Sequence, residues 1–312
     1  MGEAIVLRQA PDMGAAEFAR WQKLIEVRTG IHLPDHRKAF LMLALSARMR
    51  ESGQVEKTVG HGGSADGLFK ADGLIQEDDY NAYFVSLRDG AQAAFEWACL
   101  IDLLTVHETR FFRHPESFDL VRSYVRNVLT QHADSRQRSI QAWSVGCSTG
   151  EEVYSLALAM HELQTDTGPF YFGVTGTDIS YPALASAREG IYHLRRLIGL
   201  SDEQRERHFQ AVGDDYYQVM PAVRQRTCFV QGNVHDLRHA PNQLFDIIYC
   251  QNLLIYFQTE RRRELLSQLV EHLRPGGMLV LAPGEVLRWH HSALTRIQNK
   301  QCLAYSHRSS KP

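Results

Sequence analysis

The sequence predicts an α/β protein, with a mostly parallel sheet, helices on both faces of the sheet, and an all-helical region before it. Three observations lead to this prediction. An apolar run over 140–145 ends in a glycine turn and continues at once as an amphipathic helix. Later apolar runs alternate with helical patterns, which is typical of strands in a parallel sheet. The residues before 140 show helical rather than strand periodicity.

The composition is ordinary for a soluble globular protein. Of the 312 residues, 44% are apolar and 22% are charged, and the formal net charge is -2, so neither nucleic acid nor direct membrane insertion is expected. No apolar run approaches the roughly 20 residues of a membrane helix, and the N-terminus lacks the apolar segment of a signal peptide. The five cysteines include no Cys-x-x-Cys pair. We therefore expect a cytoplasmic protein without a disulfide framework or a bound metal.

The first helices are predicted over 16–50. Gly30 is expected to end one helix and Pro34 to begin the next. The second segment carries Arg37, Arg48 and Arg50, and at about 100° per residue Arg37 and Arg48 project within roughly 20° of each other. This pattern indicates either a solvated helix face or a weakly basic surface for an acidic partner segment.

A glycine-rich stretch over 52–73 is expected to be a flexible loop. Helical patterns resume at Tyr80 and continue to Leu104. The sequence therefore predicts an N-terminal helical domain over 1–105 and a second domain over 106–312.

The glycine turn is the sequence Gly146-Cys147-Ser148-Thr149-Gly150, and Glu151 and Glu152 follow it. Its glycines allow a sharp turn that brings backbone N–H groups close to a ligand. The helix begins with two acids where a phosphate-binding loop would place a lysine. A ligand with a positive group is therefore favoured over a phosphate.

A second apolar run, 171–178, ends in Asp178. An acid at the carboxyl end of the strand after a glycine turn is the arrangement that holds a ribose through its hydroxyls. Capping of the next helix by Asp178 is an alternative that does not exclude the first. Beyond it, 193–228 are expected to form a small insertion with short strands, including Thr227–Val230. Strands are predicted over 245–250 and 278–282, with a helix over 259–273 that stops at the Pro-Gly-Gly sequence of 275–277.

Other kinds of site have weaker support. Gly-x-Ser-x-Gly is also the nucleophile elbow of α/β-hydrolases, with Ser148 as nucleophile, but such enzymes place several strands before it. Cys147 has no evident adjacent base. His107-Glu108 begins a zinc-protease pattern that Phe111 breaks.

Several segments together resemble the CheR-type chemoreceptor methyltransferases. The matching segments are Gly30–Leu33, His107–Arg113, Trp143–Ser155, Thr177–Ile179, Ala187–Tyr192, Phe245–Asp246, Asn252–Phe257 and Leu273–Gly277. They follow the order of the family along nearly the whole chain. The resemblance implies a Rossmann-like class I fold and transfer of the methyl group of S-adenosylmethionine to receptor glutamates, with S-adenosylhomocysteine as product. It also implies a partner, the cytoplasmic helical region of a methyl-accepting chemoreceptor, and we expect the enzyme to be a monomer.

The resemblance also implies roles for individual residues. Arg113 and Tyr256 match the catalytic positions that orient the incoming carboxylate. The expected cofactor-binding residues are His107, Thr109, Arg113, Gly146, Glu152, Asp178, Asn233, Val234, Gln251 and Asn252. Arg37, Arg48 and Arg50 are the expected substrate-binding residues. Two alternatives remain beside the hydrolase. One is an S-adenosylmethionine-dependent enzyme that acts on a small molecule or another substrate, and the other is a non-catalytic regulator that binds S-adenosylmethionine or S-adenosylhomocysteine.

The chain departs from the family pattern at a few positions. Gln251 stands where an arginine is common, and Pro283-Gly284-Glu285 replaces His-Ser-Glu. These departures concern receptor docking more than the cofactor, so the identity of the receptor is not predicted.

Overall fold

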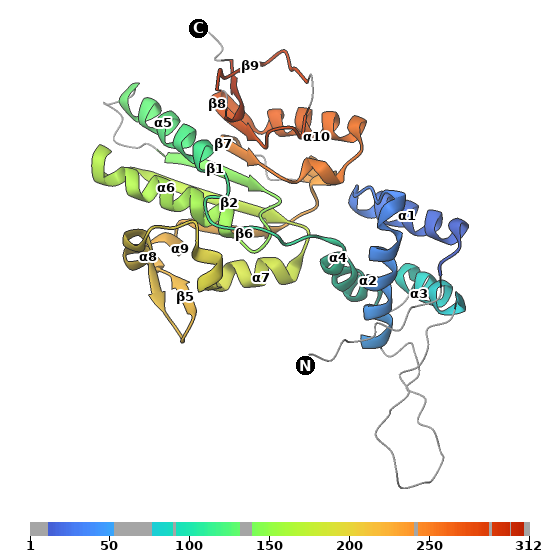
Figure 1. Cartoon of the computed structure of the whole chain (residues 1–312). Coiled ribbons are helices and arrows are strands. Elements are labelled where there is room, and N and C mark those ends of the chain that lie inside the picture. The colour runs from blue at the N-terminus through green and yellow to red at the C-terminus, as the bar shows by residue number, and fades with distance from the viewer. Residues whose placement is uncertain are drawn as a thin grey trace. The chain divides into compact units, whose positions relative to one another are not determined.

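The computed structural model describes residues 12–52, 77–89, 92–131, 139–239, 243–286, 289–299 and 301–308. The chain divides into two compact units, Met1–Val106 and His107–Pro312 (Figure 1). The glycine-rich loop predicted over 52–73 lies outside the described residues except for its first residue. Among the described residues, no helix combines the length and the apolar character needed to cross a membrane, and no cluster of His, Cys, Asp and Glu suits a metal ion.

The first unit consists of helices, as its periodicity predicts. They are α1 (Ala15–Thr29), the 3-10 turn η1 (Asp35–Arg37), α2 (Lys38–Glu51), α3 (Glu77–Asp89) and α4 (Ala93–Leu104). Gly30 ends α1 in the left-handed conformation, with φ of 77°, and its N–H donates to the Glu26 carbonyl. Trp21 of α1 stacks on Tyr83 of α3 at a centroid distance of 6.0 Å, and both side chains are fully buried. This aromatic pair joins α1 to α3.

Arg48 is not part of an exposed basic face, so this prediction is wrong. Its side chain is buried, and its Nε and Nη2 donate to the two carboxylate oxygens of Glu96 on α4 at 2.9 and 2.7 Å. Although burial opposes ionisation of Glu96, hydrogen bonds from Arg48 and Tyr83 hold its pKa below its ordinary value. Arg37 lies in η1 rather than on α2, so the angle predicted between Arg37 and Arg48 does not apply, while Arg50 is exposed.

Arg48→Ala is expected to lower the free energy of unfolding by about 3 kcal/mol, because it leaves the Glu96 carboxylate buried without its partner. Chemical denaturation followed by circular dichroism measures this loss. Arg50→Ala is the matched control on the same helix, and its stability should stay within about 0.5 kcal/mol of the unsubstituted protein. Equal stability of the two variants would contradict the structural role of Arg48.

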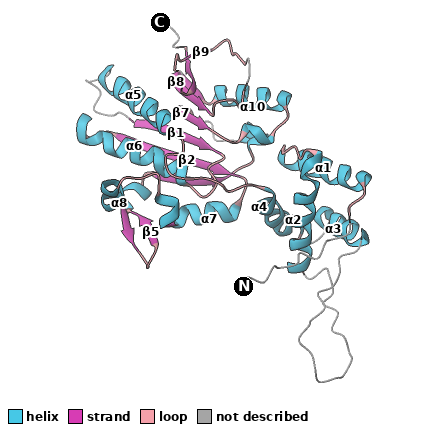
Figure 2. Cartoon of the chain, viewed as in Figure 1, coloured by secondary structure: helices cyan, strands magenta, loops and turns pink. Residues whose placement is uncertain are grey.

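The second unit is a seven-stranded sheet in the order β6-β2-β1-β7-β8-β10-β9. Parallel pairing joins β6 (Thr227–Gln231), β2 (Tyr171–Asp178), β1 (Ser139–Val145), β7 (Phe245–Cys250) and β8 (Leu273–Leu281). β10 (Leu303–His307) and β9 (Leu294–Arg296) add an antiparallel edge that the sequence analysis missed. The predicted doubly covered, mostly parallel sheet is confirmed (Figure 2).

Each face of the sheet has its own apolar core. On one face, the buried side chains of the sheet pack with α5 (Pro115–Gln131), α6 (Glu151–Thr167) and α7 (Tyr181–Glu189). On the other, they pack with α10 (Thr259–Glu271). Because successive strand residues point to opposite faces, Ile247 and Tyr249 join the first core whereas Ile248 and Cys250 join the second.

The insertion is smaller than predicted. Its three-stranded sheet consists of β3 (Ile191–His193), β5 (Tyr216–Val219) and β4 (Phe209–Ala211). The short elements η2 (Leu194–Leu197), α8 (Asp202–His208) and α9 (Pro221–Arg224) complete it. Thr227–Val230 lie instead in β6, an edge strand whose half-exposed residues give little apolar signal. This correction matters because β6 brings the residues after it to the edge where the other parallel strands end.

The boundary between α10 and β8 also differs from the prediction. The strand begins at Leu273, before the Pro-Gly-Gly sequence rather than after it. Leu273 pairs with Phe245, and the register shifts between Phe245 and Ile247. Pro275 therefore lies where the ladder is irregular, and its missing N–H is tolerated there.

Candidate functional site

The carboxyl ends of the five parallel strands lie at one edge of the sheet. The glycine turn follows β1, Asp178 ends β2, and Asn233 follows β6. Gln251 follows β7, and Ala282 follows β8. Ligands of open α/β sheets bind at this edge. The sheet thus gathers the predicted cofactor residues from segments that are far apart in the sequence.

The turn after β1 is fixed by hydrogen bonds to the end of β2. The N–H groups of Gly146 and Cys147 both donate to the Thr177 carbonyl, at 2.8 and 2.9 Å. Ser148 has a φ of 49°, and its N–H donates to Oδ2 of Asp178 at 2.7 Å. The second oxygen of Asp178 accepts from Ser180 N–H at 2.9 Å. The Asp178 carboxylate is therefore held in one orientation at the mouth of the turn.

The N-cap of α7 is Ser180, whose hydroxyl accepts from Ala183 N–H. Capping by the Asp178 side chain, the alternative weighed above, is therefore not the arrangement found. Burial raises the pKa of Asp178, and backbone N–H groups partly offset the rise. A carboxylate has about four acceptor positions, so Asp178 can still accept hydrogen bonds from a ligand hydroxyl.

Gly146 is required by the close approach of Leu253. Its φ is 76°, and a Cβ at this position would lie 2.9 Å from Leu253 Cδ1. Gly146→Ala is expected to cost about 1–3 kcal/mol of unfolding free energy, from backbone strain together with this contact. Gly168→Ala is the control, because Gly168 has a φ of 78° and a Cβ added there would meet no atom within 4 Å. The denaturation midpoint should fall further in Gly146→Ala than in Gly168→Ala. Equal falls would show that the Leu253 contact does not contribute to the loss of stability.

The two acids that begin α6 have different surroundings. Glu151 is fully buried and is already paired, since it accepts from Arg196 Nη1 at 3.2 Å and from Thr149 Oγ1 at 2.6 Å. Glu152 accepts a hydrogen bond from the Ser144 hydroxyl at 2.7 Å through one oxygen. Glu152 is therefore the acid of the pair that is suited to a ligand.

Burial raises the pKa of Glu152 to about 8. The hydrogen bond from Ser144 and the charge of Arg113 oppose this rise, whereas the nearby charge of Glu285 adds to it. A carboxylate in such surroundings is stabilised in its ionised form by a cation that donates hydrogen bonds to it. The protein thus presents a partly buried acid that favours binding of an ammonium group.

Glu285 is a site residue that the sequence analysis missed. It follows β8, is 5% exposed, and its Oε2 accepts from Ala282 N–H at 3.3 Å. Burial raises its pKa to about 6, and backbone N–H groups, including that of Ala282, limit the rise. Two signals were available, its position after a parallel strand and the glutamate that it shares with the His-Ser-Glu sequence of the family, but its proximity to Glu152 depends on the order of the strands.

Residues 107–114 form neither a helix nor a strand, and they lie beside the glycine turn as a segment that we call the strap. His107 Nδ1 lies 3.0 Å from the Ser148 hydroxyl, and the Thr109 carbonyl accepts from Arg196 Nη1 at 2.9 Å. Arg113 donates to the Glu108 carbonyl at 3.0 Å. The strap brings His107, Thr109 and Arg113 to the glycine turn and the acids of α6.

Asn252 and Tyr256 follow β7. Asn252 has a φ of 57° and hydrogen bonds to His114 at the end of the strap. Tyr256 ends the short helix η4 (Leu254–Tyr256) and packs, partly buried, on the second apolar core. Arg113 and Tyr256 therefore belong to segments that His114 and Asn252 connect.

The other predicted cofactor residues also lie at this edge. Asn233 accepts from His235 N–H through its side chain at 2.9 Å, and the buried Val234 begins η3 (Val234–His239). The Gln251 side chain donates to the Leu281 carbonyl at 3.3 Å and accepts from the Tyr249 hydroxyl at 3.2 Å. These bonds hold the Gln251 side chain against the ends of β7 and β8.

A model of the CheR methyltransferase family, described as its S-adenosylmethionine-binding domain, matches residues 107–302. The chain belongs to the CheR methyltransferase family. Its second unit is therefore an S-adenosylmethionine-dependent methyltransferase domain, and the hydrolase interpretation of Ser148 is wrong. Cys147 is buried, and burial raises the pKa of its thiol well above the ordinary value, which disfavours the thiolate that a nucleophile requires.

Full-length relatives extend the likeness over both units. The chemotaxis protein methyltransferase of Salmonella typhimurium is 30% identical over 291 residues, which cover 91% of this chain and 89% of the relative. That of Escherichia coli is 30% identical over 274 residues, covering 86% and 84%. That of Borreliella burgdorferi is 27% identical over 274 residues, covering 87% and 88%. The similarity to chemotaxis protein methyltransferases therefore extends over the N-terminal unit as well as the methyltransferase domain.

The acids at the sheet edge fit the cofactor of this family. S-Adenosylmethionine carries an α-ammonium group and a ribose, and Glu152 and Asp178 offer acceptors for the two. Neither acid is consumed by an ion pair with another described residue, in contrast to Glu151. The two carboxylates, Glu152 and Asp178, therefore suit a cationic nucleoside as ligand.

Proposed function

We propose that this chain methylates glutamate side chains in the cytoplasmic helical region of a methyl-accepting chemoreceptor, forming glutamyl methyl esters. The observation that carries this proposal is the position of Arg113 on the strap, where its charge acts on Glu152 at the expected ammonium site. A cation at this place favours binding of an anionic substrate, and the side chain of a receptor glutamate is such an anion.

The reaction requires no general base. A glutamate side chain has a reference pKa of about 4.3, so it is already a carboxylate at neutral pH. When bound, the cofactor would supply a methyl group activated by its sulfonium, and transfer of this methyl group to a carboxylate oxygen would leave the sulfur as the thioether of S-adenosylhomocysteine. The chain contributes alignment and the exclusion of water. Arg113 and Tyr256 orient the substrate carboxylate, while Glu152 and Asp178 hold the cofactor.

The remaining cofactor contacts follow from the placement of the other segments. Asn233 and Val234 border the adenine, and Gln251 and Asn252 close the site after β7. Gly146 sets the left-handed turn after β1, beside which the cofactor would lie. His107 and Thr109 complete the site from the strap.

Receptor docking is assigned to the first unit. Arg37 and Arg50 are its proposed contacts with acidic receptor helices, and Arg48 is excluded because Glu96 neutralises it. Arg37 also stacks over the Phe40 ring at 5.5 Å, which orients its guanidinium. We take the enzyme to act as a monomer in the cytoplasm.

Transfer of tritiated methyl groups to cytoplasmic fragments of candidate receptors tests the proposal. Label that is released as methanol at alkaline pH identifies an ester, whereas an amide or amine product keeps its label. A fragment in which the methylated glutamates are replaced by alanine is the control. Tight binding of S-adenosylhomocysteine without transfer to any receptor would instead select the non-catalytic regulator.

A further inference from the structure

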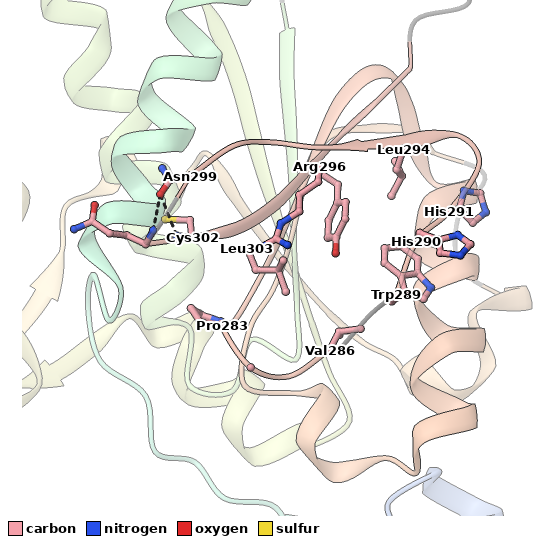
Figure 3. Close-up of a pocket in the computed structure, with 13 residues that line it drawn as sticks. Pro283, Val286, Trp289, His290, His291, Leu294, Arg296, Asn299, Cys302 and Leu303 are labelled. Carbon is pink, nitrogen blue, oxygen red and sulfur yellow. Dashed lines mark hydrogen bonds between the residues drawn. The ribbon is translucent and has the colours of Figure 1, made fainter.

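A cavity apart from the cofactor site lies in the second unit, between the loop after β8 and the strands β9 and β10 (Figure 3). Its volume is about 480 Å³, within the range of sites for small molecules. Leu294, Leu303 and Tyr305 line it with side chains that are largely buried. Its wall is therefore apolar and built by the antiparallel strands rather than by the cofactor edge.

The polar lining of this cavity is cationic or neutral. Arg296, His290 and His291 line it, and the lining residues that the structure describes include no aspartate or glutamate. The Arg296 residue is exposed, and its side chain makes no ion pair or hydrogen bond with any described residue, although its charge acts on Tyr305. Figure 3 shows Arg296 extending from β9 toward the interior of the cavity. A guanidinium that is not neutralised by the protein favours an anionic group of a ligand.

An aromatic surface lies beside Arg296 and the two histidines. Trp289 contacts Tyr305 edge to face at a centroid distance of 5.3 Å, and it lies 6.2 Å from the His291 ring. Trp289 is only partly buried, so part of its ring remains open to the cavity. Aromatic side chains of this kind stack on planar rings. The cavity thus combines a stacking surface with an unneutralised guanidinium.

The cavity adjoins the cofactor site without being part of it. Gly284 and Val286 line it, whereas Glu285 between them is buried and acts on Glu152. The Glu285 carboxylate accepts a hydrogen bond from Ala282 N–H at the end of β8. The loop over 283–286 therefore separates the two sites and contributes residues to both.

We propose that this cavity binds a ring-bearing organic anion, whose planar ring stacks on Trp289 and whose anionic group pairs with Arg296. The ligand is of about nucleotide size, as the volume of the cavity requires. Nothing in this proposal depends on which receptor is methylated, because the cavity lies apart from the residues that hold the cofactor.

Calorimetric titration of guanosine monophosphate into the full chain tests the proposal. S-Adenosylhomocysteine is kept at saturation so that the cofactor site is occupied. A guanine nucleotide is chosen because the cofactor site would also accept an adenine nucleotide. Guanosine monophosphate should bind at one site per chain, with guanosine and inorganic phosphate each at least tenfold weaker. Absence of binding, or equal binding of guanosine or of phosphate, would overturn the proposal.

Two variants identify the site. Arg296→Ala should weaken guanosine monophosphate binding about tenfold or more, which is the loss of a charge-assisted hydrogen bond. Arg263→Ala, an exposed arginine on α10, is the matched control and should bind as the unsubstituted chain does. Arg296→Gln keeps the aliphatic stem and replaces Arg296→Ala if thermal unfolding shows that the latter is misfolded. Unchanged affinity in the folded variant would overturn the assignment to this cavity.

Discussion

Replacement of Glu152 by glutamine is expected to weaken S-adenosylhomocysteine binding about a thousandfold. The substitution keeps the size of the side chain and can keep the hydrogen bond from Ser144, but it removes the charge that balances the ligand ammonium. Leaving one member of a desolvated charge pair without its partner costs about 2–5 kcal/mol, and about 4 kcal/mol corresponds to this loss. Isothermal titration calorimetry at pH 8 measures the change.

The neighbouring acid provides the control. Glu151→Gln removes a carboxylate that is paired with Arg196 and Thr149, so it should lower the melting temperature while the affinity falls less than tenfold. The two substitutions differ by one position in the sequence and should separate binding from stability. If Glu151→Gln lost as much affinity as Glu152→Gln, the assignment of the ammonium site to Glu152 would be contradicted.

Arg113→Ala is expected to lower the rate of methyl transfer by about 10²–10³, the size of effect seen when one oriented electrostatic contact to a reacting group is lost. Cofactor affinity should change less than tenfold, since Arg113 affects Glu152 through its charge and not through a hydrogen bond. Single-turnover methyl incorporation and calorimetric affinity, measured on the same preparation, separate the two effects.

Arg110→Ala is the matched control for Arg113. Both arginines belong to the strap, but Arg110 is exposed and its side chain should not reach the substrate. Transfer by Arg110→Ala should remain within threefold of the unsubstituted rate, by the usual scale of surface substitutions. Equal losses of rate and of cofactor affinity in Arg113→Ala would refute its role in orienting the substrate carboxylate.

The sequence predicted the features that depend on local pattern. The strand, turn and helix over 139–167 could be read from an apolar run, two glycines and a helical period, and their order placed Glu152 and Asp178 at one edge of the sheet. The helical first unit and its break at Gly30 followed from the same kind of signal.

The features that were missed depend on pairing across the fold. β9 is an edge strand of three residues, two of them exposed, so its apolar pattern is weak. β10 has five residues and only antiparallel partners, and the strand predicted over Thr227–Val230 was misplaced because its pairing with β2 depends on the fold. Burial of Arg48 could not be read from its helix, because the cause is Glu96, which lies 48 residues further along the chain. Glu285 was missed for the same reason, since β8 must lie beside β7 before its loop reaches Glu152.

Proton release on cofactor binding tests the central role of Glu152 most directly. Because burial raises the pKa of Glu152 to about 8, the free protein holds this proton at pH 7, and a bound ammonium should lower the pKa and expel it. Affinity should therefore rise with pH up to about 8 and level off above it.

The measurement is a set of calorimetric titrations of S-adenosylhomocysteine at pH 7 in buffers that differ in ionisation enthalpy. A pKa of about 8 predicts release of about 0.9 proton per site from the unsubstituted protein and almost none from Glu152→Gln. No release, or equal release from both proteins, would show that Glu152 does not bind the ammonium group.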